Sequence, residues 1–133
     1  MSDVCYVYVI GIPEMDLSKI GISRNPSTRL SQLRTGSPFT MELRMCLRTP
    51  SDSTARSLES AFHKVMESKR RSGEWFHLSL DEACRILAIN LLAHLRFAVG
   101  FEAEEAISLL SECGVPAKII DCLDFDSGDG RSQ

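Results

Sequence analysis

Apolar residues alternate with small or polar residues in two short runs near the start of the chain. Residues 6–10, Tyr-Val-Tyr-Val-Ile, combine aromatic and β-branched side chains, which are typical of a β-strand. Residues 20–23, Ile-Gly-Ile-Ser, repeat the period of two. Turn-forming residues separate the two runs, namely Gly11, Pro13 and Asp16. The pattern predicts two strands joined as a hairpin with a long loop.

A helix signal follows the second run directly. Asn25 is a favourable N-cap, and Pro26 suits the first helical position, where no hydrogen-bonded N–H is needed. Leu30 and Leu33 supply an apolar face, and Gly36 suits the end of a helix. We therefore expect a helix that begins at Pro26 and ends just before Gly36.

A strict alternation follows at residues 41–48. Four apolar side chains are expected on one face of the chain: Met41, Leu43, Met45 and Leu47. Four polar or basic ones are expected on the other: Glu42, Arg44, Cys46 and Arg48. The period of two predicts a half-buried strand with basic residues on its open face.

A long helix is expected from Ser51 to about Arg70, because apolar residues recur along it at three- and four-residue spacing. Glu59 is the exception, since it places a carboxylate at the edge of the apolar stripe, with His63 one turn later. Such a carboxylate is paired, hydrogen-bonded or metal-bound, or it reaches solvent past small neighbours. The spacing leaves both interpretations open.

The second half of the chain is predicted to be mostly helical. Residues 74–78 are typical of a last short strand, and residues 79–82 form a capping-box pattern. The helix that this pattern opens, at residues 80–99, is apolar nearly all round, which favours burial on several sides or packing against a partner chain. Shorter helices are expected at residues 102–113 and 116–123.

Together these elements predict an α/β (α+β) fold with a small, mostly antiparallel sheet of three or four strands flanked by helices. We expect a first domain over residues 1–80 and a helical appendage for packing or oligomerisation over residues 81–124. The polar, Gly-rich residues 125–133 are expected to form a disordered tail. The apolar helix at residues 80–99 also suggests a homodimer.

Charge is distributed unevenly along the chain, although the net charge is only −3. Residues 1–75 hold 11 basic and 8 acidic residues, a balance of +3, whereas residues 76–133 hold 4 and 10, a balance of −6. The first part is therefore able to face a phosphate backbone, and the second part is not. Scatter on solvated faces is the alternative interpretation.

Five cysteines, an odd number with no Cys-x-x-Cys pair, indicate reduced thiols in a cytoplasmic protein rather than a zinc knuckle. The first four residues lack a basic region followed by an apolar run, so no secretory signal is expected. The longest apolar stretch, residues 86–99, is too short to span a bilayer, so we expect no membrane association.

Several of these residues resemble the GIY-YIG nuclease superfamily over residues 4–80. Tyr8 lies thirteen residues before Gly21, and Arg29 lies eight residues after it, as in that family. Lys19 stands where the family usually has a second tyrosine. The Lys-Ile-Gly form, followed later by Gly-Glu-Trp-Phe at residues 73–76, resembles a phage and bacterial branch.

The resemblance implies a metal-dependent endonuclease that hydrolyses DNA. It implies that Glu59 binds Mg²⁺ or Mn²⁺, that Arg29 neutralises the developing phosphoryl charge, and that Tyr8 positions or deprotonates the attacking water. Lys19 replaces the usual tyrosine and is expected to assist Tyr8 or to bind phosphate.

Four further residues are supporting candidates. His63 is a candidate proton carrier beside the metal, and Glu74 lies where the family has its final polar residue. Tyr6 and Gly21 complete the strand motif. Two other functions stay open: a non-catalytic nucleic-acid-binding module, and an interaction or regulatory protein built on the same scaffold.

Overall fold

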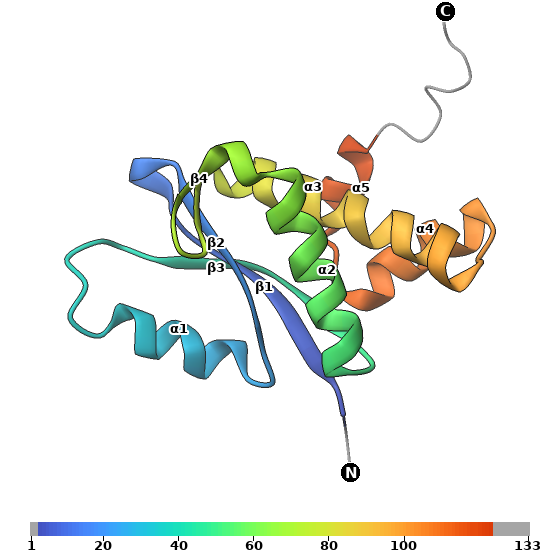
Figure 1. Cartoon of the computed structure of the whole chain (residues 1–133), viewed down its shortest axis with the longest axis horizontal. Coiled ribbons are helices and arrows are strands. Elements are labelled where there is room, and N and C mark those ends of the chain that lie inside the picture. Colours follow the sequence, from blue (N-terminus) through green and yellow to red (C-terminus); the bar gives the residue numbers. More distant parts are fainter. Residues whose placement is uncertain (1–2, 124–133) are drawn as a thin grey trace, which may run out of the picture.

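One five-stranded antiparallel sheet, with the strand order β3-β1-β2-β5-β4, forms the centre of the computed structural model, which describes residues 3–123 (Figure 1). The strands are β1 (Cys5–Ile12), β2 (Leu17–Ser23), β3 (Glu42–Thr49), β4 (Arg70–Ser72) and β5 (Trp75–His77). The α-helices are α1 (Pro26–Arg34), α2 (Asp52–Val65), α3 (Leu80–Ala93), α4 (Ala103–Cys113) and α5 (Ala117–Cys122). Shorter helical segments are η1 (Pro13–Met15), η2 (Glu67–Lys69) and the π-helical η3 (His94–Val99).

The two faces of the sheet are covered differently. Figure 1 shows α1 on one side, and α2 and α3 on the other. Under α1, Tyr8 and Ile10 of β1 pack with Leu30 and Leu33 of the helix. On the opposite face, residues of β1, β2 and β3 form one larger apolar core with α2, α3, α4 and α5.

The predicted fold class is confirmed, because the chain forms an antiparallel sheet flanked by helices and ends in further helices. Local signals explain the helix starts. The Asn25 side chain accepts a hydrogen bond from the Thr28 backbone N–H, 3.2 Å between heavy atoms, which confirms Asn25 as the N-cap of α1. Ser51 and Ser79 cap α2 and α3 in the same way.

The predicted alternation of residues 41–48 is wrong in its second half. Val9 pairs with Met45 but Ile10 pairs with Leu43, so the register shifts and Arg44 is the extra residue of a β-bulge. Met45 therefore packs in the large core, whereas Leu43 packs on the α1 face. A bulge depends on the partner strand, so the sequence period alone does not indicate it.

The predicted helix from Ser51 to about Arg70 is too long. The helix α2 ends at Val65, and Arg70 instead begins a fifth strand, β4, which the sequence did not predict. Arg70 pairs with Phe76 across a tight hairpin and donates to the Gly73 carbonyl oxygen, 2.5 Å away. Tertiary pairing overrides helix propensity at this point.

The helices after residue 80 share a core with the sheet. Leu87 of α3, Leu110 of α4 and Ile119 of α5 belong to the same buried cluster as Val7 of β1. The division of the chain at residue 80 stays a prediction, and the predicted disordered tail at residues 125–133 lies outside the described residues. Among residues 3–123, no helix combines the length and the apolar character needed to cross a membrane.

The core between α2 and the sheet generates a first test. Phe62 is fully buried and meets Phe76 edge to face, with 5.4 Å between ring centroids. We expect Phe62→Ala to lower the free energy of unfolding by about 3–5 kcal/mol, because it leaves a cavity. The matched control on the same helix is Val65→Ala, since Val65 is 64% exposed and should change it by less than about 0.5 kcal/mol. Urea titrations compare them, and equal losses would contradict this packing.

Candidate functional site

Tyr8 and Gly21 lie opposite each other on the α1 face of the sheet. They are paired residues of β1 and β2, and the side chain of Tyr8 is only 1% exposed. A Cβ atom placed on Gly21 would lie 2.4 Å from the Tyr8 hydroxyl oxygen. Because Gly21 has no side chain, the phenol ring of Tyr8 can lie directly against β2 at this position.

Lys19, which stands at the position of the family's second tyrosine, is held by an ion pair. Its Nζ lies 2.6 Å from Oε1 of Glu74, and the Lys19 side chain is only 8% exposed, against 42% for Glu74. The ammonium group also lies 6.0 Å from the centroid of the Trp75 ring. Because Lys19 pairs with Trp75 across β2 and β5, the pairing of these strands places the lysine beside its partner.

Glu59 reaches the same region from α2. The residue is half-buried, and it forms no hydrogen bond or ion pair with any side chain in residues 3–123. Burial raises the pKa of the Glu59 carboxyl group, and the negative charge of Glu74 raises it further. The positive charges of His63, Arg56 and Lys19, in that order of size, oppose the rise. Glu59 is thus a carboxylate held near a second carboxylate without a direct partner.

The structure gives His63 a partner other than Glu59. β5 pairs with residues 17–19 of β2, so residues 20–23 have no strand on that side within the described chain. The His63 Nε2 lies 3.3 Å from the Ile20 carbonyl oxygen, and since a carbonyl only accepts, the imidazole donates. The proton on Nε2 is used to satisfy the open edge of β2, which favours a structural role for His63.

Arg29 and Tyr6 lie on the α1 face with Tyr8. Arg29 is half-buried on the side of α1 that carries Leu30, and its Nη1 lies 3.5 Å from Oε1 of Gln32. Among residues 3–123, no hydrogen bond or ion pair joins Arg29 to Tyr8 or Glu59. Tyr6 is half-buried and lies two residues before Tyr8 on the same strand. The guanidinium group therefore remains available for a ligand.

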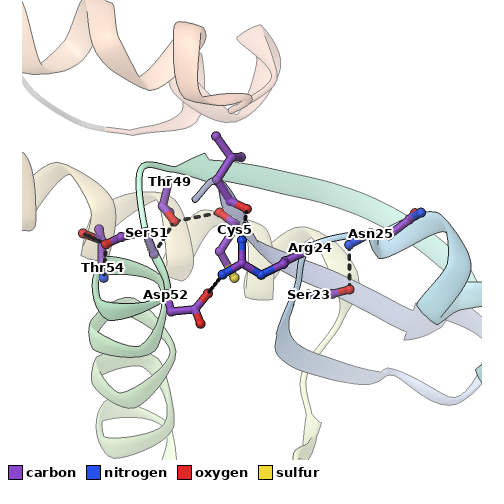
Figure 2. A network of polar contacts seen from close by, with 9 residues as sticks. Cys5, Ser23, Arg24, Asn25, Thr49, Ser51, Asp52 and Thr54 are labelled. Atoms are coloured by element: carbon purple, nitrogen blue, oxygen red, sulfur yellow. Dashed lines mark hydrogen bonds and ion pairs between the residues drawn. The ribbon is translucent and has the colours of Figure 1, made fainter. Parts of the chain in front are cut away.

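A polar network fixes the starts of α1 and α2 relative to each other (Figure 2). Arg24, just before α1, donates to Oδ1 of Asp52 in the first turn of α2 at 3.1 Å, and to the Val4 carbonyl oxygen at 3.3 Å. Thr49 donates to the Cys5 carbonyl oxygen at 2.7 Å. The helices that carry Arg29 and Glu59 are thus tied to one end of β1.

The site resembles a sparse metal site rather than a cage. Within residues 3–123, no group of three or more His, Cys, Asp or Glu residues is arranged to hold a metal ion. Glu59 alone offers a half-buried carboxylate without a direct partner, and Glu74 lies near it. One or two carboxylates with water in the remaining positions suit Mg²⁺, so the residues present fit such an ion.

The cysteines contribute no nucleophile to this site. All five are free, and burial raises the pKa of the Cys84 thiol to about 12. Burial also raises the pKa values of Cys46 and Cys113. Thiols held in the protonated form are poor nucleophiles, so the chemistry of the site rests on oxygen and nitrogen groups.

Two contributors to the site were missed by the sequence analysis. Arg24 anchors the helix starts, and Trp75 packs beside Lys19. The adjacency of Trp75 to Glu74 was the available signal. The partnership of Arg24 with Asp52 had no sequence signal, because the two residues are 28 positions apart.

The fold is that of an α+β domain, an antiparallel sheet flanked by helices. A family model described as the T5orf172 domain matches residues 5–90, and the chain therefore belongs to the T5orf172 domain family. This is a phage-associated, nuclease-like domain with a GIY-YIG-like fold, which suggests DNA as a partner. No curated protein and no solved structure matches the chain significantly.

The close approach of Tyr8 to Gly21 generates a second test. We expect Gly21→Ala to lower the free energy of unfolding by about 1–3 kcal/mol, because the new methyl group overlaps the phenol. In a Tyr8→Leu background the same change should be much less harmful, since the phenol is gone. Urea titrations of the four proteins give the coupling energy, and additive effects would contradict the contact.

The buried ion pair generates a third test. Glu74→Ala leaves the Lys19 ammonium group buried without its carboxylate, and we expect a loss of about 1–3 kcal/mol. Lys19→Met frees only Glu74, which is partly exposed, and should change stability by less than about 1 kcal/mol. Thermal and urea unfolding measure both variants.

The control for this asymmetry is Glu67→Ala. Glu67 pairs with Arg70 at 2.9 Å, but on an exposed helix end, so its removal should change stability by less than about 0.5 kcal/mol. A Lys19→Met loss larger than that of Glu74→Ala would show that the ammonium group is not the buried partner.

Proposed function

We propose that this protein is a metal-dependent endonuclease of the GIY-YIG type, which hydrolyses phosphodiester bonds in DNA. The observation that carries the proposal is Glu59, a half-buried carboxylate with a raised pKa and no direct partner among residues 3–123. Keeping a charge in such a place is unfavourable unless a ligand compensates for it. A divalent cation is a compensation that fits the family's nuclease-like character, and Glu59 would be the residue that holds it.

Glu59 holds the cation in this proposal, with Glu74 near enough to influence it. When bound, Mg²⁺ or Mn²⁺ supplies Lewis-acid stabilisation of charge on the phosphoryl and leaving oxygens. The small number of protein ligands leaves coordination positions for water and for the substrate.

Arg29 binds the phosphate in this proposal. Its planar guanidinium group suits two phosphate oxygens, and its only side-chain partner among residues 3–123 is Gln32, at the long distance of 3.5 Å. Because α1 covers the face of the sheet that Tyr8 occupies, Arg29 is carried on the helix next to Tyr8. It stabilises negative charge that increases as the attacking oxygen bonds to phosphorus.

Tyr8 and Lys19 act at the surface of β2. The Tyr8 hydroxyl group lies over Gly21, in the segment of β2 that β5 does not cover, from which it positions the attacking water. Lys19 sets the electrostatic potential beside Tyr8 and Glu59, while its pair with Glu74 fixes its position. His63 holds the edge of β2 and is a positioning residue.

A non-catalytic DNA-binding module is the second candidate. The observation that favours it is the burial of Tyr8, whose side chain is 1% exposed and so reaches a water molecule only after a local shift. The pairing of Lys19 with Glu74 points the same way, because it removes a free cation from the site. In this case, Arg29 and other exposed basic residues would bind the DNA backbone without cleavage.

Glu59→Gln distinguishes the two candidates. We expect the wild-type protein with Mg²⁺ or Mn²⁺ to nick or cut DNA, and Glu59→Gln to lower the rate by at least about 100-fold, since the carboxylate is replaced by a neutral amide. Single-stranded, duplex and branched DNA are tested by gel electrophoresis, with Glu112→Gln on α4 as the matched control. Metal-independent, salt-sensitive binding without cleavage by the wild type would support the binding module instead.

The same variant should be more stable than the wild type at neutral pH. The pKa of Glu59 is higher in the folded protein than in the unfolded chain, so its contribution to stability is fully present at low pH and is lost as the pH rises through the folded pKa. Glu59→Gln removes this loss, and its gain in Tm should shrink as the pH falls toward about 4. A Tm below that of the wild type at neutral pH would contradict the unfavourable burial of the Glu59 charge, and circular dichroism verifies that the variant is folded for the activity comparison.

A further inference from the structure

An exposed aromatic residue marks the end of the third long helix. After α3, residues 94–99 form the π-helical segment η3, in which Phe97 is 80% exposed. Ile89, eight residues earlier in α3, is 41% exposed. π-Helical turns are rare and are frequent at functional sites. The chain then turns back at Gly100, whose N–H donates to the Leu95 carbonyl oxygen at 3.1 Å. A large apolar side chain is thus held out from the surface by a defined backbone.

Two grooves flank this side chain. One lies between Ala93 and Phe97 on one side and Ser57 and Ala61 of α2 on the other, with a volume of about 410 Å³. The second lies between the same ridge and Ala103 and Ile107 of α4, with a volume of about 380 Å³. We call the ridge of Ile89, Ala93 and Phe97, together with the two grooves, the Phe97 face. The Phe97 face therefore has a projecting aromatic side chain and, on each side of it, a groove of similar volume that can receive such a side chain.

Each groove also contains a buried polar atom without a hydrogen bond. Nδ2 of Asn90, in the groove beside α2, has no partner within the described residues. The same holds for Nε of Arg96, in the groove beside α4. An unsatisfied buried donor costs about 1–3 kcal/mol, but both atoms are covered by this chain, so they mark locally unfavourable packing under this face and are not presented to a partner.

The charges on the two sides of the Phe97 face are opposite. Along the exposed side of α2, next to Ser57 and Ala61, lie Arg56 and Lys64. On α4, next to Ala103, lies the exposed Glu104, and the first turn of that helix is acidic. A surface that is basic at one border and acidic at the opposite border is complementary to its own copy after a two-fold rotation.

We propose that a second copy of this chain docks on the Phe97 face across a two-fold axis that runs along the Ile89–Phe97 ridge. Because residues on a two-fold axis meet their own copies, this axis brings the two Phe97 side chains together, and they pass beside each other so that each enters a flanking groove of the other copy. The same axis places α2 of each copy opposite α4 of the other. The basic border then faces the acidic border twice. The occupant is a second copy because the projecting side chain, its receptor groove and both charges belong to one surface. The proposal does not depend on nuclease activity.

Sedimentation equilibrium and light scattering on the full chain test the proposal. We expect a particle of twice the 14.8 kDa chain mass. Phe97→Glu should raise the dimer dissociation constant at least about 30-fold, because it puts a charge at the centre of the interface. Phe39→Glu is the matched control, since Phe39 is 41% exposed in the loop before β3, and it should leave the mass unchanged. Circular dichroism verifies that both variants are folded.

A charge exchange tests the orientation of the two copies. Lys64→Glu alone and Glu104→Lys alone should each weaken self-association, because each places like charges at both borders. A mixture of the two variants should associate more tightly than either alone, since both borders then pair opposite charges. Increasing salt should remove this preference.

Three results would overturn the proposal. A wild-type mass of one chain at concentrations well above the micromolar range would exclude the dimer. A folded Phe97→Glu protein that remains dimeric would place the interface elsewhere. A mixture of the charge variants that associates no better than the separate proteins would exclude the axis along the ridge.

Discussion

The position of β1 between β3 and β2 is the constraint on which the rest of the structure depends. This strand is hydrogen-bonded on both sides, and its residues from Val7 to Ile12 are buried, so its two faces separate the α1 cluster from the large core. Tyr8 faces α1, whereas Val7 and Val9 face α2 and α3. A strand fixed from both sides cannot slip by one residue without exchanging these faces. The position of every group in the candidate site is therefore fixed relative to β1.

The sequence was sufficient where structure depends on neighbours along the chain. The hairpin of β1 and β2 and the cap at Asn25 follow from alternation and capping chemistry, and both lie where expected. The bulge at Arg44 and the strand β4 depend instead on distant partners, and neither was predicted. The site divides in the same way. The predicted hairpin placed Tyr8 and Gly21 on neighbouring strands, where they are paired. The Lys19–Glu74 pair instead joins residues 55 positions apart and needs β5 in place.

The electrostatics of the site depend on the ion pair between Lys19 and Glu74. Glu74 neutralises Lys19 directly, and Lys19 lowers the pKa of Glu59 less than His63 and Arg56 do. The remaining positive charges act on Glu59 only through space, and burial outweighs them. The Glu59 carboxyl group is thus poorly solvated, and the basic groups near it do not cancel the rise in its pKa. Active sites commonly carry such perturbed groups at a local cost in stability.

The shortness of β5 has a consequence for how such a domain changes over evolutionary time. With only three residues, β5 leaves half of β2 uncovered, and α2 fills the gap through the contact of His63 with the Ile20 carbonyl oxygen. An unpaired edge normally invites another strand and aggregation, and here a helix blocks it. A longer β5 would compete with α2 for the same edge. Insertions that lengthen the β4–β5 hairpin would therefore displace His63 from the Ile20 carbonyl oxygen and shift the helix that carries Glu59.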